Sequence, residues 1–133
     1  MSYQVIHQLL DAQLATVPGL PSFQAENKRT KAGSTSAFSR STLLPARPDL
    51  LSIGVNSVAE LRGLYQVDLY YPTGEGTANA DAMADAIVAA FPRSVQLESG
   101  AVNVRVRMVW RQAAQVIDTF YSCPVVVEWT CTE

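Results

Sequence analysis

Hydrophobic residues recur along this chain with two different periods, and the changes of period divide it into segments. Residues 2–17 carry apolar side chains at helical spacing, with Ser2 at the N-cap position and a Pro-Gly pair directly after the segment. Residues 77–91 repeat this spacing between Thr77, which can cap a helix, and a proline, which ends one. The pattern therefore predicts two amphipathic helices.

Alternation between apolar and polar residues predicts strands in most of the remaining chain. The predicted strands cover residues 37–44, 60–71, 95–98, 101–111 and 119–132, and a short extended piece covers 22–26. Pro124 has no amide hydrogen and predicts a strand edge or a bulge. The order of elements predicts an α+β fold with a mixed or antiparallel sheet of about four to five strands. Both helices pack on one face of it, and an extended arm or hairpin is added.

The whole chain, residues 1–133, is expected to form a single domain. A chain of this length buries roughly two thirds of the surface that its unfolded form exposes, and 48% of these residues are hydrophobic. The net charge of −2 provides no general attraction to nucleic acid or to an anionic membrane. No apolar run approaches the roughly 20 residues of a membrane helix, and the first residues lack the basic region of a signal peptide.

The two cysteines, Cys123 and Cys131, fall in the same predicted strand. Their positions along an extended strand place them about 26 Å apart, whereas a disulfide needs Cα atoms within about 7 Å. We therefore expect no bridge within the chain, which is typical of a protein made in a reducing compartment.

Residues 27–57 form a polar insertion that we expect to be an arm or loop within the domain. Its first part, residues 27–48, carries five basic residues and no acid, which leaves a net charge of −7 on the rest of the chain. Two interpretations remain open, a solvated loop and an arm that lies on a neighbouring copy. Long loops in compact domains are usually functional or disordered, and the opposite charges of arm and body favour contact between copies.

Three arginines of the strand 101–111, Arg105, Arg107 and Arg111, are predicted to lie on one face of that strand. The opposite face is apolar and is formed by Val102, Val104, Val106, Met108 and Trp110. The arginine face is either a solvated surface or a charged contact surface for a partner. Both interpretations remain open, because the sheet face opposite the helices must either be polar or be covered by a partner.

The chain offers no set of residues for metal binding or nucleophilic catalysis. His7 is the single histidine, and we expect no cysteine or acid at ligand spacing from it. A zinc site needs three or four ligands. The serines that could act as nucleophiles gather in the insertion, the segment least able to hold a group rigidly beside a base.

Two further motifs have plain structural interpretations. Asp81 and Asp85 stand one turn apart on the second predicted helix. We interpret them as part of a solvated helix face near the positive end of the helix dipole. Gly74-Glu75-Gly76 connects a strand to a helix but lacks the lysine of a P-loop and the third glycine of a dinucleotide motif. We therefore expect a protein that is not an enzyme, with no catalytic residues, no metal and no cofactor.

The run from Gly63 to Gly76, GLYQVDLYYPTGEG, resembles the signature of the tail-terminator-like (tail completion) proteins of tailed bacteriophages. Other segments that resemble this family, in chain order, are Pro21–Asn27, Leu43–Ala46, Ala82–Phe91 and Cys123–Val127. The resemblance covers nearly the whole chain. The sequence departs from the family at Lys28-Arg29, where the family leads us to expect an aromatic residue and a proline. This difference affects the expected path of the arm and not the assignment to the family.

The resemblance implies a structural virion protein of phages with long non-contractile tails, the siphoviruses. Such proteins form a ring, usually a homohexamer, at the head-proximal end of the tail, where the ring stops growth of the tail tube and joins it to the neck. The implied partners are other copies of the chain, the tail tube protein and a neck or head-completion protein. DNA is only cargo that passes through the ring, and no membrane is involved. The implied location is the virion tail, after assembly in the host cytoplasm.

The resemblance and the charge pattern together suggest where contacts lie. Neighbour contacts are expected at Phe38, Arg40, Leu43 and Arg47, and tube or neck contacts at Arg105, Arg107 and Arg111. Two alternatives remain open. One is another neck or head-closure component of the same virion. The other is a nucleic-acid-binding module that uses the insertion, although Phe38 is the single aromatic residue among its basic ones and base stacking needs more.

Overall fold

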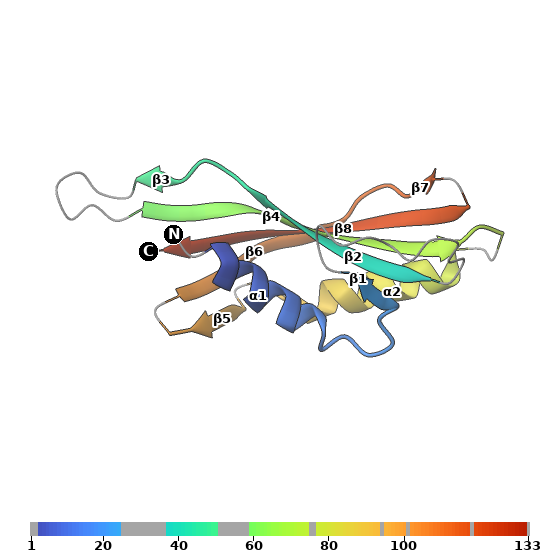
Figure 1. Ribbon diagram of the computed structural model, residues 1–133, viewed down its shortest axis with the longest axis horizontal. Helices are drawn as coiled ribbons and strands as arrows, with labels where there is room; N and C mark the ends of the chain where they lie inside the picture. The colour runs from blue at the N-terminus through green and yellow to red at the C-terminus, as the bar shows by residue number, and fades with distance from the viewer. Residues whose placement is uncertain are drawn as a thin grey trace.

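The computed structural model describes residues 3–24, 37–50, 59–74, 77–93, 95–100, 102–117 and 119–132 (Figure 1). The elements in chain order are α1 (Tyr3–Leu14), β1 (Ser22–Gln24), β2 (Phe38–Pro45), β3 (Asp49–Leu50), β4 (Ala59–Pro72), α2 (Ala78–Ala90), β5 (Gln96–Ser99), β6 (Val102–Arg111), β7 (Gln115–Ile117) and β8 (Phe120–Thr132). The predicted α+β class is confirmed. Both predicted helices and all five predicted strands are present, and β3 and β7 are short additions to them.

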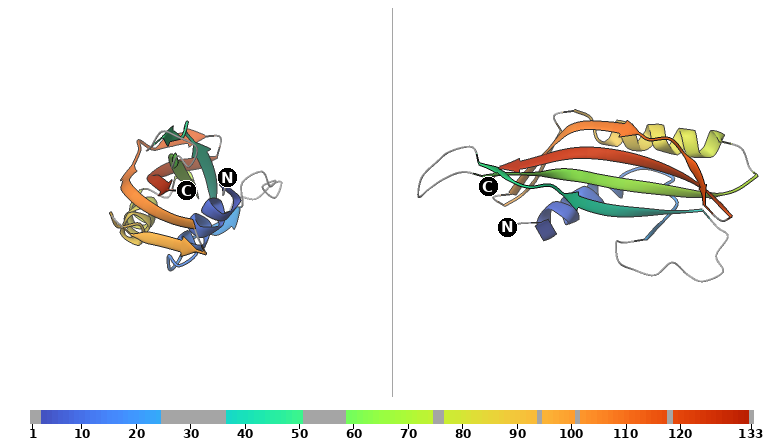
Figure 2. Two further views of the ribbon diagram at one scale, coloured as in Figure 1. Left: turned by 90° about the vertical axis from the view of Figure 1, so that its left-hand side faces the viewer. Right: turned by 90° about the horizontal axis from the view of Figure 1, so that it is seen from above.

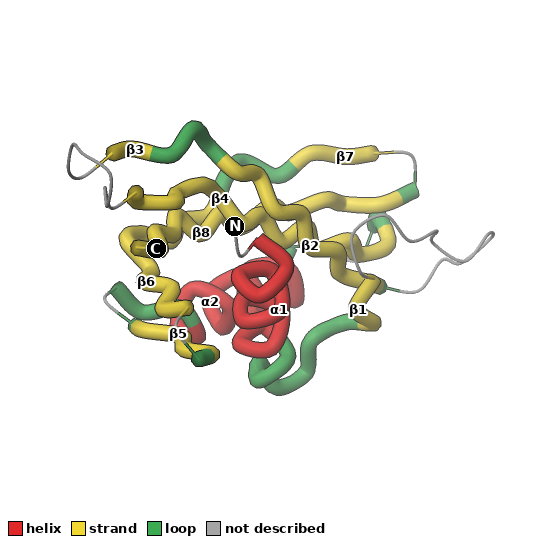
Figure 3. The backbone as a smooth tube through the Cα atoms, turned by 60° about the vertical axis from the view of Figure 1, so that its left-hand side comes forward, coloured by secondary structure: helices red, strands yellow, loops and turns green. Residues whose placement is uncertain are grey.

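The molecule has two layers, a long twisted sheet and a pair of helices on one of its faces (Figure 1). The main strand order is β1-β2-β4-β8-β6-β5, while β3 pairs with β4 and β7 pairs with β8. Only the β1–β2 pair is parallel among the described strands, so the sheet is mixed. Seen end-on in Figure 2, the sheet curls around the helices, and in Figure 3 α1 lies between the edge strands β5 and β1.

The long strands β4 and β8 form the centre of the sheet. Their antiparallel register runs without interruption from Glu60 opposite Thr132 to Pro72 opposite Phe120. β2 adds to one side of this ribbon and β6 to the other. The sequence produces this ribbon because both segments alternate apolar and polar residues over their whole length, which fixes one face toward the helices.

The core lies between the helices and the sheet face that we call the helix face. Trp129 and Tyr65 are its largest fully buried side chains, and the Tyr65 ring lies 6.2 Å from the ring of Phe91 at the end of α2. The aliphatic part of the core includes Ile6, Leu10, Leu14, Val67, Leu69, Ile87, Val104, Val106, Val125 and Val127. Each fully buried side chain of this kind stabilises the fold by about 1.5–3 kcal/mol.

β6 contains a β-bulge between Val106 and Met108, with Arg107 as the additional residue. Since side chains alternate along a strand, one extra residue reverses the facing of every residue that follows it. Met108 and Trp110 therefore face away from the helices, and Arg111 faces toward them. The predicted apolar face with Val106, Met108 and Trp110 together is wrong for this reason.

Pro124 lies in the central strand β8, so the predicted strand edge is wrong at this position. Its carbonyl oxygen accepts a hydrogen bond from the Gln112 amide at 3.0 Å, just beyond the last β6 pair, Arg111 with Val125. The next residues of β8 pair with β7, beginning at Ser122. The missing amide hydrogen of Pro124 thus falls where the neighbouring strand changes from β6 to β7.

The ends of the helices differ slightly from the predicted ones. α1 ends at Leu14, and the chain continues in tight turns that keep Val17 buried. Thr77 holds the N-cap position of α2 but makes no side-chain capping hydrogen bond. Ser2, residues 25–36 and 51–58, and Glu75-Gly76 lie outside the described residues, and these ranges include much of the insertion. Within the part of the chain that is described, no helix is long and apolar enough to cross a membrane.

Candidate functional site

We call the sheet face opposite α1 and α2 the open face, since both described helices lie on the other face (Figure 1). Strand register places paired residues on the same face. The open face is formed by Phe38, Arg40, Thr42, Leu44, Arg62, Leu64, Gln66, Asp68, Tyr70, Arg105, Met108, Trp110, Phe120, Ser122, Pro124, Val126, Glu128 and Thr130.

The open face is rich in aromatic residues and arginine. Aromatic residues, methionine and arginine are enriched in the buried centres of interfaces, whereas lysine and acids are depleted. The open face contains four aromatic residues, one methionine and three arginines, without a lysine, and it also carries two acids, Asp68 and Glu128. Leu44, Met108 and Trp110 leave 42%, 44% and 36% of their surface exposed there.

One end of the open face carries an aromatic cluster. The Phe38 ring stacks on Tyr70 at 4.5 Å and meets Phe120 edge-on at 5.2 Å, while the Arg40 guanidinium lies 5.9 Å from the Phe38 ring centre. Burial, followed by the nearby Asp68 carboxylate, raises the pKa of the Tyr70 hydroxyl above its ordinary value. The cluster is a rigid aromatic platform with a cation beside it.

The four residues expected at the subunit interface do not lie together. Phe38 and Arg40 share the aromatic end of the open face, but Phe38 is only 7% exposed. Leu43 faces the other way and packs against the core. Arg47 lies beyond the end of β2, where its carbonyl oxygen accepts a hydrogen bond from Arg62 Nε at 3.4 Å.

The predicted common face of Arg105, Arg107 and Arg111 is wrong because the bulge separates them. Arg105 precedes the bulge and lies on the open face, and Arg107 is the bulged residue; both are exposed. Arg111 follows the bulge on the helix face, where it forms an ion pair with Asp81 of α2. The hydrogen bond from Arg111 holds the pKa of Asp81 below its ordinary value, and the same bond raises the pKa of Arg111.

A small polar cluster lies under α1, centred on Asp11. Its carboxylate accepts hydrogen bonds from the Ser41 hydroxyl at 2.9 Å and from the Tyr65 hydroxyl, and His7 Nε2 lies 3.6 Å away. The expectation that no acid stands at ligand spacing from His7 is wrong, since Asp11 is one helical turn away. The i, i+4 spacing of the two residues on α1 was the available sequence signal.

The residue types of this cluster are those of a hydrolase triad, but their order is different. In a catalytic triad the histidine stands between the serine and the carboxylate and takes the serine proton. Here Ser41 donates directly to Asp11, and Ser41 is fully buried. This arrangement holds α1 against β2 and β4 and does not present a nucleophile. Among the described residues, no group of three or more His, Cys, Asp and Glu side chains could hold a metal ion.

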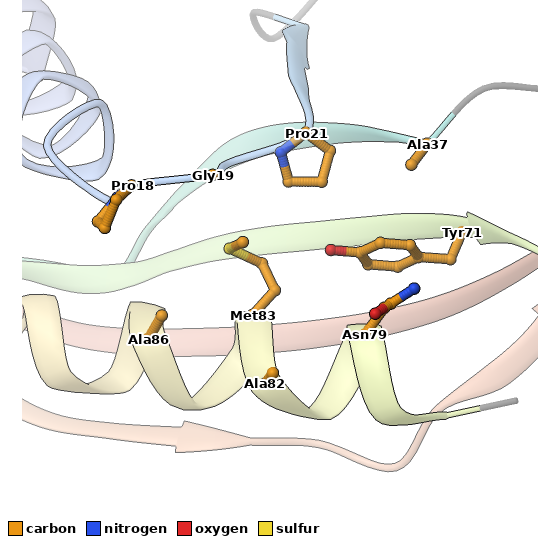
Figure 4. Close-up of a pocket in the computed structure, with 9 residues that line it drawn as sticks. All are labelled: Pro18, Gly19, Pro21, Ala37, Tyr71, Asn79, Ala82, Met83 and Ala86. Carbon is orange, nitrogen blue, oxygen red and sulfur yellow. The ribbon is translucent and has the colours of Figure 1, made fainter.

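A groove of about 540 Å³ lies on the helix side, between α2 and the chain that leads from α1 to β1 (Figure 4). Its lining is mostly small and apolar and consists of Pro18, Gly19, Pro21, Ala37, Tyr71, Asn79, Ala82, Met83 and Ala86. Burial raises the pKa of the Tyr71 hydroxyl above its ordinary value. Gly74, just after β4, has a positive φ of 90°, a conformation that glycine adopts without steric cost.

These features define a class of protein, a small α+β domain with two helices on one face of a curled sheet. The family described as phage tail terminator protein matches residues 5–129, and the chain belongs to that family. The predicted family is thereby confirmed. One solved structure superimposes with a TM-score of 0.74 over 98% of this chain and 96% of its own, at 24% sequence identity, which shows a shared fold. No curated protein matches the chain.

Proposed function

We propose that this protein forms a ring, most simply a homohexamer, that terminates the tail tube of a siphovirus-type phage and joins it to the neck. Membership of the phage tail terminator family supports a structural role in the tail. The observation that supports ring formation is the open face, which exposes large apolar residues next to arginines on a domain whose core is already formed. A surface of this kind is expected to be covered in the assembled state.

The proposed partners are other copies of this chain, the tail tube protein and a neck or head-completion protein. A head-to-tail contact between copies closes into a ring when its rotation permits, and a ring has two ends for two different partners. We place the ring at the head-proximal end of the tail, assembled in the host cytoplasm, with DNA only passing through it. The protein would act through its interfaces and without catalysis.

The proposal is tested by mixing the purified protein with self-assembled tail tubes and imaging them by negative-stain electron microscopy. We expect caps at tube ends and arrest of tube growth, with the mass of the cap corresponding to a closed ring. Native mass spectrometry at high concentration measures the ring number. A protein that never decorates tube ends and never self-associates in the presence of tubes contradicts the proposal.

The alternative neck or head-closure role is separated by co-purification. Retention on immobilised tail tube protein supports tail termination, whereas retention on portal or adaptor protein alone supports the alternative. Binding to DNA that weakens steeply as salt rises would instead support the nucleic-acid-binding module.

A further inference from the structure

The bulge in β6 has a consequence for the surface, because it turns two large apolar residues outward. If β6 were a regular strand of the same sequence, with Arg107 in the ladder, side-chain alternation would place Met108 and Trp110 on the helix face with Val106. They instead lie on the open face and remain 44% and 36% exposed. Bulges often re-aim side chains at functional positions, and this one produces an apolar patch.

The groove beside α2 is an apolar hollow on a different surface of the same molecule. Its floor and walls are short side chains such as Ala82 and Ala86, with Met83 and Pro21 across from each other in Figure 4. Its volume of about 540 Å³ can accommodate large side chains of a partner, and its polar groups include the side chains of Tyr71 and Asn79. Patch and groove are therefore matched in chemistry.

The charges on the two elements are opposite. The charged residues of β6 are all arginines, and those of α2 are both aspartates. One such pair, Arg111 with Asp81, already forms within the chain. One turn further along α2, Asp85 is exposed, and Arg107 is exposed at the bulge beside the apolar patch. Asp85 does not line the groove, but it lies on the helix that forms one of its walls. A second copy of this chain thus supplies both apolar residues for the groove and a charge opposite to that of α2.

We propose that Met108 and Trp110 of one copy dock into the groove beside α2 of the next copy, with Arg107 facing the neighbour's Asp85. The inference rests on the proposed ring and names the contact that builds it. Because patch and groove lie on different surfaces, the contact is head-to-tail and repeats from copy to copy until it closes.

The first experiment is disulfide cross-linking between two single variants, Trp110→Cys and Ala82→Cys, mixed in equal amounts with tail tubes present. We expect a cross-linked dimer in the mixture and none from either variant alone. Cys123 and Cys131 are buried, so wild-type protein provides the background. A Trp110→Cys homodimer, a cross-link to the tube protein alone, or no cross-link at all overturns the proposal.

The second experiment reverses the charges. Arg107→Glu and Asp85→Arg should each weaken self-association or tube-end capping by about tenfold or more, the loss expected for a charge pair turned into a like-charge pair. The two variants mixed together should associate again, because each supplies the charge that the other lacks. A failure of the mixture to recover contradicts the proposed pairing.

The third experiment fills or breaks the apolar contact. Trp110→Glu and Ala82→Trp, one on each side, should reduce self-association roughly 30-fold, as for a central aromatic contact. Gln112→Glu, at an exposed position near the patch, is the matched control and should leave association unchanged. Circular dichroism verifies that each variant is folded.

Failure of this inference is distinguishable from failure of the proposed function. If tubes are capped by wild type and by all these variants alike, the ring function stands and the assigned contact is wrong. If the cross-linked oligomer forms but never caps a tube, the contact stands and the tail-terminator function is wrong.

Discussion

At the scale of single residues, Asp11 shows how one carboxylate ties three elements together. It belongs to α1, and the hydroxyls that donate to it come from Ser41 in β2 and Tyr65 in β4. Both hydroxyl residues are fully buried, so an acceptor for them is required inside the fold. The cluster therefore fixes where α1 sits on the sheet.

Replacing Asp11 with alanine should destabilise the protein by about 1–3 kcal/mol, because two buried hydroxyls lose this acceptor. Gln8→Ala, at an exposed position of the same helix, is the control and should change stability by no more than about 0.5 kcal/mol. Urea unfolding followed by tryptophan fluorescence measures both. A double-mutant cycle with Tyr65→Phe should show a coupling of about 0.5–3 kcal/mol. Equal stability of the Asp11 and Gln8 variants would refute this role.

At the scale of elements, Gly63 sets how closely β2 can approach the central ribbon. A Cβ atom at this position would lie 2.5 Å from the Leu44 carbonyl oxygen and 3.0 Å from the Trp129 ring. The contact to the carbonyl involves backbone, which cannot move aside without shifting β2. The absence of a side chain at Gly63 thus permits both the β2–β4 ladder and the burial of Trp129.

Gly63→Val should therefore destabilise the protein by about 3 kcal/mol or more, even though valine favours strands, because overpacking outweighs β propensity here. The neighbouring substitution Leu64→Val introduces the same residue on the open face and should cost less than about 1.5 kcal/mol. Chemical denaturation compares the two directly. If the Gly63 variant is as stable as the Leu64 variant, the steric argument fails.

The sequence predicts regular elements well in this protein because their periodicity is long and uninterrupted. The strands β4 and β8 and both helices follow from alternation or helical spacing alone. The bulge at Arg107 does not, since it depends on the register with β8, and it changes the surface to which Trp110 belongs. Phe38 and Leu43, by contrast, stand five residues apart in the regular strand β2, so alternation alone already places them on opposite faces.

At the scale of the whole molecule, one face of the sheet builds the domain and the other is available for assembly. The helix face holds nearly all of the large buried side chains of the described chain. The open face holds the aromatic cluster, the arginines and the patch of Met108 and Trp110. The candidate contact residues could be named from the sequence by type, but their grouping required the sheet register.

The central position of β8 makes its two cysteines reporters of global unfolding. Cys123 and Cys131 are 0% and 2% exposed, in the strand that pairs with both β4 and β6. Burial is the largest effect on the Cys123 thiol and raises its pKa above the ordinary 9.0. The folded state therefore favours the protonated thiol. This stabilisation is present below the unfolded pKa and is lost as pH rises through the higher folded value.

We therefore expect both thiols to react with a thiol reagent at neutral pH at least about 10³-fold more slowly than in urea-unfolded protein, since reaction requires the sheet to open. The exposed-cysteine variant Ala82→Cys is the control and should gain one fast-reacting thiol per chain. The urea midpoint of thiol exposure should coincide with that of tryptophan fluorescence, because β8 cannot leave the sheet without unfolding the core. A native-state thiol that reacts at the rate of the control, or a thiol midpoint well below the fluorescence midpoint, would show that β8 opens locally and that the ribbon of β4 and β8 is not the stable centre of the fold.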